Sequence, residues 1–178
     1  MTIALAGRRI DAAGARMASF PLANADWVRS QLRQLFKEHR PAALVTSAAC
    51  GSDLLALDEA GALGIRRRVI LPFAPELFRE SSVVDRPGEW GALYDRIIQD
   101  VSAAEDLVVL GVVPNSKDAY LATNRAILAG AEEIAGAGAG VTAVLVWDNR
   151  PRGTDDLTEA FRSEAQQRGY AIRIIPTL

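Results

Sequence analysis

Short apolar runs alternate along the chain with longer segments in which apolar residues recur every three or four positions. The short runs have the length of buried strands, and the longer segments have the spacing of amphipathic helices. Such alternation is typical of βαβ units, in which a helix joins two parallel strands. Strands are expected at Thr2–Ala6, Ala43–Thr46, Arg68–Leu71, Leu107–Leu110, Thr142–Val146 and Ile172–Ile175.

Helices are expected between these strands, at Asn24–His39, Asp53–Leu63, Trp90–Val101, Tyr120–Ala135 and Asp155–Arg168. Asn24 and Thr154 carry side chains that favour the capping position of a helix. Two stretches interrupt the alternation: Ser81–Trp90 is irregular, and Ala135–Gly140 is a flexible connector between segments of the same kind. The pattern predicts one α/β domain, residues 1–178, with a mostly parallel sheet of about six strands flanked by helices.

The composition narrows the classes of function. The 178 residues are 49% hydrophobic, which suits one sizeable core, and 20 Lys and Arg nearly balance 22 Asp and Glu. A nearly neutral chain has no field that favours nucleic acid or an anionic membrane. No signal peptide and no apolar run of about 18 residues is recognised, so a cytoplasmic location is expected. With one cysteine, Cys50, and one histidine, His39, no disulfide or Cys/His metal site is predicted, and no cofactor is expected.

The turn inside "LVTSAACGSDLLAL", Leu44–Leu57, is the first candidate site. Ligands of open α/β sheets bind at the carboxyl ends of strands, where a helix N-terminus offers free N–H groups to a phosphate. Small and polar residues make up this turn, including Ser47, Ala48, Gly51, Ser52 and Asp53. The alternative interpretation is structural, because such turns often use small residues and Ser52 or Asp53 can simply cap the helix. The turn has neither the lysine of a Walker A loop nor a G-x-G-x-x-G spacing.

A second turn follows the first expected strand in "ALAGRRID", where Gly7 and Arg8 stand just past its carboxyl end. Arg8 can bind an anion through two parallel hydrogen bonds. The alternative is that Arg8 and Arg9 are solvated surface residues. Both interpretations stay open on sequence alone.

Three segments together resemble the SLOG superfamily, the Rossmann-like group that includes the SMF/DprA and LOG proteins. They are "LAGRRID", "SAACGSDLLALDEAGALGIRRRVILPF" and "YLATNRAIL". Their order matches a G-[ST]-R-like first turn, a small-residue G-x-D turn, and the helix and strand that follow. The resemblance implies a Rossmann-like three-layer sandwich that binds a nucleotide or nucleotide-derived ligand at the carboxyl edge of the sheet. The matching positions are Gly7, Arg8, Ser47, Gly51, Ser52 and Asp53.

The LOG branch of this superfamily hydrolyses nucleoside monophosphates and carries a P-G-G-x-G-T-x-x-E motif. In "WDNRPRGTDDLTEAF", Gly153 and Thr154 match the G-T, but Leu157 stands where the glutamate is expected. Asp155, Asp156 or Glu159 can replace that glutamate, since an oxocarbenium-like centre needs a suitably placed carboxylate. Their alternative role is to complement the dipole at a helix start. No catalytic residue is therefore assigned.

Further candidates flank the same edge. Arg79, Ser81 and Ser82 follow the third strand in a segment interpreted as a mobile loop over the site. Tyr120 and Asn124 are four positions apart on one helix face, where the ring can stack on a base and the amide can contact a ribose. Tyr120 can equally pack in the core.

Asp148 ends the fifth strand, and it can accept ribose hydrogen bonds or start the next turn. A Ser-His-Asp hydrolase is disfavoured because no G-x-S-x-G elbow is present and His39 is expected at the opposite edge. Cys50 is interpreted as a small buried residue rather than a nucleophile.

Three functional hypotheses follow. The first is a nucleotide-sensing domain of SLOG type with bacterial signalling relatives, the second a nucleotide N-glycosidase with a different carboxylate, and the third an interaction module with a vestigial pocket.

The apolar helix faces that contain Trp27 and Trp90 are also compatible with a homodimer. The candidate ligand-binding residues are Gly7, Arg8, Ser47, Ala48, Gly51, Ser52, Asp53, Arg79, Ser81, Tyr120, Asn124, Asp148, Gly153 and Thr154.

Overall fold

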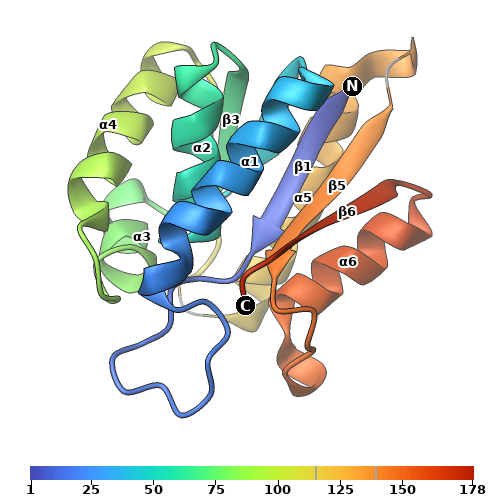
Figure 1. Ribbon diagram of the computed structural model, residues 1–178. Helices are drawn as coiled ribbons and strands as arrows, with labels where there is room; N and C mark the ends of the chain where they lie inside the picture. The colour runs from blue at the N-terminus through green and yellow to red at the C-terminus, as the bar shows by residue number, and fades with distance from the viewer. Residues whose placement is uncertain (115, 139) are drawn as a thin grey trace.

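The computed structural model describes residues 1–114, 116–138 and 140–178 of the chain. These residues form a sheet of six parallel strands in the order β4-β3-β2-β1-β5-β6 (Figure 1). The strands are β1 (Thr2–Gly7), β2 (Ala43–Thr46), β3 (Arg66–Leu71), β4 (Leu107–Val109), β5 (Val141–Trp147) and β6 (Ala171–Pro176). The predicted α/β fold is confirmed, and the sheet is parallel throughout.

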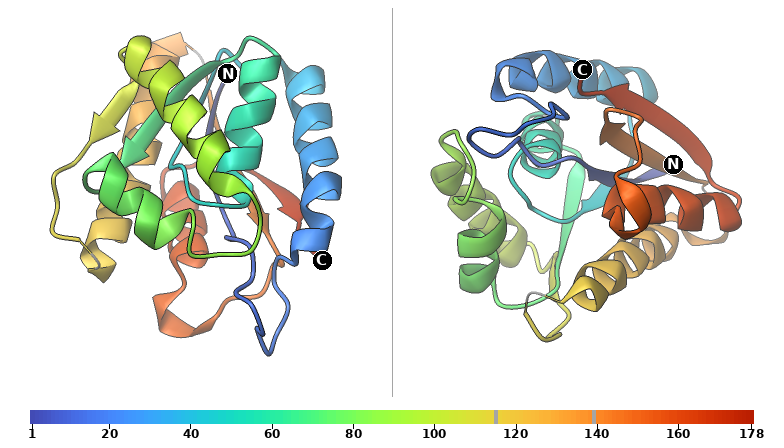
Figure 2. Two further views of the ribbon diagram at one scale, coloured as in Figure 1. Left: turned by 90° about the vertical axis from the view of Figure 1, so that its left-hand side faces the viewer. Right: turned by 90° about the horizontal axis from the view of Figure 1, so that it is seen from below.

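Helices cover both faces of the sheet and complete a Rossmann-like three-layer sandwich (Figures 1 and 2). One face is covered by α1 (Ala25–His39), α2 (Ser52–Ala62) and α4 (Trp90–Ala103), with α3 (Pro75–Ser82) beside α4. The other face is covered by α5 (Lys117–Ala135) and α6 (Leu157–Gln167). Short 3-10 turns occur at Leu22–Asn24, Gly136–Gly138 and Gly153–Asp155.

Strand periodicity explains why there are two cores. Successive side chains of a strand point to opposite faces, so Ile3 and Leu5 of β1 join the core under α1 and α2, while Ala4 joins the core under α5. Both cores contain fully buried large residues, such as Phe36 in the first and Trp147 in the second. The strands β1, β2 and β5 are covered on both sides, which accounts for their mostly apolar sequences.

The strand order reverses at β1. From β1 the chain moves through β2 and β3 to β4, then crosses by α5 to β5 on the opposite side of β1. The crevice at the carboxyl end of such a reversal is where ligands of open α/β sheets bind. In Figure 1 this edge is at the bottom, and the right-hand view of Figure 2 looks onto it. The end of α1, where His39 lies, is at the opposite edge, as expected.

Several predicted boundaries are wrong. Residues Pro75–Ser82 form helix α3 rather than a mobile loop, because Pro75 starts the helix and Phe78 anchors it in the core. Helix α5 begins at Lys117, three residues earlier than expected, because the Ser116 hydroxyl accepts the amide of Ala119. Within the predicted connector Ala135–Gly140, Gly136–Gly138 is a 3-10 turn and Ala139 lies outside the described residues.

The two helix caps predicted from the sequence also differ from those in the structure. Helix α6 begins at Leu157, and its cap is Asp156 rather than Thr154: the Asp156 carboxylate accepts the amides of Thr158 and Glu159. Asn24 stands at the cap of α1, but its side chain makes no capping bond and donates to the carbonyl of Thr177. It joins the start of α1 to the chain end beyond β6.

Candidate functional site

A cavity of about 460 Å³ opens at the carboxyl edge, beside the reversal of strand order. Its walls come from the end of β1, the starts of α2 and α6, the end of α3 and the first half of α5. Cavities of this size hold small ligands. Segments that are far apart in the sequence therefore line one cavity, and the view onto this edge shows their backbones side by side (Figure 2, right).

Gly7 and Gly51 are required by packing. A Cβ on Gly7 would lie 2.5 Å from both the Ser52 Oγ and the Val146 carbonyl oxygen. Gly51 has a positive φ of 93°, and a Cβ there would lie 2.9 Å from the amide nitrogen of Ile10. Both glycines let the segment after β1 cross the start of α2 in close contact.

Polar groups at the start of α2 make hydrogen bonds within the protein. The Ser52 hydroxyl donates to the carbonyl of Arg8 at 2.7 Å, and the amides of Ser52, Leu54 and Leu55 also donate to nearby carbonyls. Ala48 is fully buried in the core. Two of the four amides that a helix leaves free at its start, those of Ser52 and Leu54, are thus used here, which leaves only part of the expected phosphate cradle.

Asp53, the second residue of α2, is a wall residue of the cavity and only 7% exposed. Its Oδ2 accepts the amide of Ala49 at 3.1 Å. The Thr46 hydroxyl lies 2.9 Å from the Leu5 carbonyl and also close to the Asp53 carboxyl, and its one proton serves one of these acceptors at a time. Burial raises the pKa of Asp53 to about 7, against the opposing effects of the Ala49 amide, the Thr46 hydroxyl and the Arg9 charge. A carboxyl that changes charge near neutral pH therefore borders the cavity.

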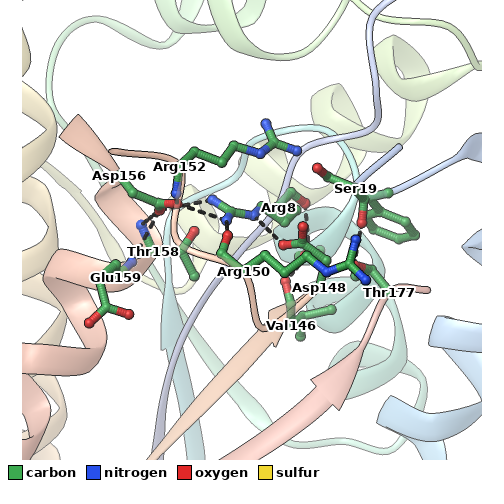
Figure 3. Close-up of polar contacts among 12 residues, drawn as sticks. Arg8, Ser19, Val146, Asp148, Arg150, Arg152, Asp156, Thr158, Glu159 and Thr177 are labelled. Carbon is green, nitrogen blue, oxygen red and sulfur yellow. Dashed lines mark hydrogen bonds and ion pairs between the residues drawn. The ribbon is translucent and has the colours of Figure 1, made fainter. Parts of the chain in front are cut away.

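Arg8 does not present a free guanidinium to the cavity (Figure 3). It donates to Asp156 at 2.7 and 2.8 Å in a bidentate pair, to Asp148 at 3.0 Å, and to the carbonyl of Arg150 at 2.7 Å. Its charged group also lies 5.3 Å from the ring centre of Trp147. Arg8 thus joins the ends of β1 and β5 to the start of α6.

Asp156 is the centre of this cluster, which we call the Arg8 lock: Arg8, Asp148 and Asp156. Asp156 accepts Arg8 and the amides of Arg152, Thr158 and Glu159. Burial acts to raise its pKa, but the bonds from Arg8 and these amides outweigh burial and hold the pKa below the ordinary carboxyl value. Asp156 is therefore an ionised structural anchor, and the bond from Arg162 likewise lowers the pKa of Glu159.

Cationic groups do reach the cavity, from other positions. We call Arg9, Arg86 and Arg152 the arginine rim, because all three line the cavity and keep part of their surface in solvent. Arg9 binds the Asp85 carboxylate at 2.9 and 3.2 Å, and Arg86 shares that carboxylate at 3.2 Å. Two guanidinium groups on one carboxylate leave an excess positive charge at the rim.

The opposite wall is aromatic and polar. Tyr120 lines the cavity and meets Phe73 edge to face, with ring centres 6.3 Å apart. Asn124 donates through Nδ2 to the carbonyl of Leu157 at 2.8 Å, which leaves its Oδ1 as an acceptor. Ser47 and Thr158 add hydroxyl groups to the wall, and the Ser81 hydroxyl donates to the carbonyl of Leu77.

The remaining predicted site residues lie apart from the cavity. Arg79 binds Asp95 on the surface of α3 and α4. Asp148 belongs to the Arg8 lock, and Gly153 is exposed beside it with a positive φ of 72°. The side chain of Thr154 lies outside the described part of the chain. Burial raises the pKa of the Cys50 thiol to about 11, so Cys50 is a buried thiol and not a thiolate.

The residues of the arginine rim and Phe78 were not identified from the sequence as lining the cavity. Arg9 was interpreted as surface, and Arg86 and Arg152 stand in irregular stretches without a periodic signal. Arg86 and Arg152 are each next to turn residues, in "DRPG" and "PRG", which was the available hint for these two. Spacing alone could not assign them to one cavity, because they come from three separate loops.

A search of protein-family models found no match to this chain, and a search of curated proteins found none either. Within residues 1–114, 116–138 and 140–178, no three His, Cys, Asp or Glu side chains are grouped to hold a metal ion. The helices of the same described residues include none with the length and apolar character needed to cross a bilayer.

Proposed function

We propose that this protein binds a nucleotide or nucleotide-derived ligand in the cavity at the carboxyl edge, as the resemblance to the SLOG superfamily implies. The observation that carries the proposal is the division of the cavity into an arginine rim and an aromatic, polar inner wall. A nucleotide has the matching division, with anionic phosphate at one end and a flat base at the other. The site at the strand reversal is also where such ligands bind in this class of fold.

The phosphate is assigned to the arginine rim rather than to Arg8. A guanidinium binds phosphate through charge-assisted hydrogen bonds, and four of the five N–H groups of Arg8 already donate to Asp148, Asp156 and the Arg150 carbonyl. Arg9 and Arg86 share one carboxylate, so a phosphate can take over part of their hydrogen bonding.

The nucleoside is assigned to the inner wall. Tyr120 offers a ring for stacking, and the Asn124 Oδ1 and the hydroxyls of Ser47 and Thr158 offer hydrogen-bonding groups. These groups come from α5, α6 and the turn after β2, which are rigidly packed elements. A pre-formed wall lowers the cost of ordering the site on binding.

Binding without hydrolysis is the preferred form of this proposal. The N-glycosidase alternative needs a free carboxylate near Asp155, Asp156 or Glu159. Asp156 is held in the Arg8 lock, Glu159 is paired with Arg162, and Asp155 is paired with Lys117. Each of these carboxylates therefore has an internal cationic partner.

The test is thermal denaturation with AMP, GMP, CMP, UMP and NAD⁺, with chromatography of each mixture for released base. A ligand at about 100 times its dissociation constant adds about 2.7 kcal/mol of stability. Stabilisation with intact ligand supports binding, and released base would support the hydrolase instead. No stabilisation by any of these compounds would overturn both and favour an interaction module.

A matched pair of arginine variants locates the site. Arg86→Ala is expected to weaken nucleotide binding about tenfold or more, because a hydrogen bond to a charged group is worth about 1.5–3 kcal/mol. Arg79→Ala is the control, since Arg79 also pairs with an aspartate but outside the cavity. Equal loss in both variants would contradict the assignment of phosphate to the rim.

A further inference from the structure

The Asp53 carboxyl differs from the other acidic groups at the cavity. Asp156 is bound by Arg8, Asp155 by Lys117, and Asp11 has the Arg152 guanidinium 3.9 Å away. Among the described residues, Asp53 has no side chain of opposite charge within ion-pair distance, although it is more than nine-tenths buried. Within the part of the chain that the structure describes, its Oδ2 accepts the Ala49 amide, and the neighbouring Thr46 hydroxyl donates to the Leu5 carbonyl.

The second oxygen of Asp53 is open to the cavity. The buried side-chain polar atom that lacks a partner in the described part of the chain is the Trp147 Nε1. The Asp53 Oδ1 is not among the buried atoms without a partner, and no hydrogen bond to it is formed among the described residues, so we infer that it faces the cavity that Asp53 borders. A buried carboxyl without a partner costs free energy, and a donor from a ligand would remove part of that cost.

We infer that Asp53 receives a hydrogen-bond donor from the nucleoside part of the ligand, so that ligand binding is linked to loss of the Asp53 proton. This inference rests on the proposed nucleotide-binding function. It reverses the orientation expected from the sequence, in which the turn before α2 holds the phosphate.

Three observations favour this orientation. The amides of Ser52 and Leu54 at the start of α2 already donate to carbonyl oxygens outside the regular helix pattern. A phosphate placed there would meet the Asp53 carboxylate, and like charges at short distance repel. The arginine rim offers the phosphate a cationic surface instead.

The charged groups around Asp53 are held in ion pairs, so we expect the titration of Asp53 itself to dominate the pH dependence of binding. From the segment after β1 it faces Arg8, Arg9 and Asp11, all held in ion pairs, and Arg9 acts on it through its charge. From the other walls the cavity adds Arg86, Arg152, Asp155 and Asp156, each with a partner. Burial raises the pKa of Asp53 to about 7, which brings this titration into an accessible range.

The experiment is calorimetric titration of the full chain between about pH 6 and pH 8, with the best-binding nucleotide of the panel and its nucleoside. The nucleoside lacks a phosphate, whose own proton dissociates near pH 6. Affinity for the nucleoside is expected to rise about tenfold across this range, because a group of pKa near 7 goes from about one-tenth to about nine-tenths ionised. Asp53→Asn should abolish the rise.

Asp155→Asn is the matched control, since Asp155 lines the same cavity but is paired with Lys117, and it should keep the rise. Affinity that falls or stays constant as pH increases, or a rise that persists in Asp53→Asn, would overturn the inference and leave nucleotide binding intact. Failure of every compound to bind at any pH would overturn the proposed function and this inference with it.

Discussion

Replacement of Arg8 by methionine tests whether the Arg8 lock stabilises the fold. The change removes the guanidinium but keeps an unbranched side chain of similar length. It leaves Asp148 and Asp156 without their cationic partner, and their side chains are only 4% and 1% exposed. Taking one partner from a buried ion pair costs about 3–5 kcal/mol, because the remaining charge stays buried.

The expected loss is a large share of the total stability. Small domains are stable by about 5–15 kcal/mol, so Arg8→Met should lower the free energy of unfolding by about 4 kcal/mol. Urea denaturation at pH 7, followed by circular dichroism, measures it. Arg79→Met is the control: that ion pair is exposed, and such pairs contribute about 1 kcal/mol or less.

Neutralising the carboxylates should reverse part of the loss. Asp148→Asn and Asp156→Asn, added to Arg8→Met, remove the stranded charges, and asparagine remains a good helix cap at position 156. Equal, small losses in Arg8→Met and Arg79→Met would refute the argument. So would a triple variant no more stable than Arg8→Met, since the cost would then have another origin.

Three further predictions concern the cavity and its surroundings. Burial raises the pKa of Asp53 in the folded protein to about 7 from the ordinary 3.8, so ionised Asp53 lowers the free energy of unfolding increasingly as pH rises between these values, by about 4 kcal/mol above them. Asp53→Asn should therefore raise the melting temperature at about pH 8 and change it little near pH 4. An equal change at both pH values would contradict this. Gly7→Ala should cost about 1–3 kcal/mol in urea denaturation, because its Cβ would overlap the Val146 carbonyl. Gly130→Ala should cost less, because its Cβ would lie 3.3 Å from a side-chain methyl of Ile70 that can shift by a small amount. Trypsin should cleave first after Arg16, in the exposed loop between Asp11 and Ser19. Mass spectrometry of the early fragments measures this, and a first cleavage at another site would contradict it.

Much of the fold could be predicted because helix and strand periodicities are local properties of the chain. Each of the six expected strands overlaps a strand of the structure, because a short apolar run between turn residues rarely forms anything other than a strand. Helix α3 was missed because its eight residues make only about two turns, too few for a periodic pattern to repeat. The starts of α5 and α6 were missed because capping depends on which side chain accepts the free amides.

The sequence pointed to the edge where the cavity lies, but not to the contacts that its residues make. Strand-to-helix turns at the carboxyl edge point to a ligand site by chain order alone, and the cavity is there. Whether Arg8 is free or paired could not be predicted, because its partners Asp148 and Asp156 lie 140 and 148 residues further along the chain. The same holds for the arginine rim, which three separate loops assemble.

Residue pattern alone was thus sufficient for the elements, their alternation and the edge that carries the cavity. Tertiary structure decided the strand order, the commitment of Arg8 to internal carboxylates and the isolation of Asp53. The physical reason is that amphipathic periodicity acts between neighbours in sequence, whereas the state of a charged group depends on burial and on partners that only folding brings near.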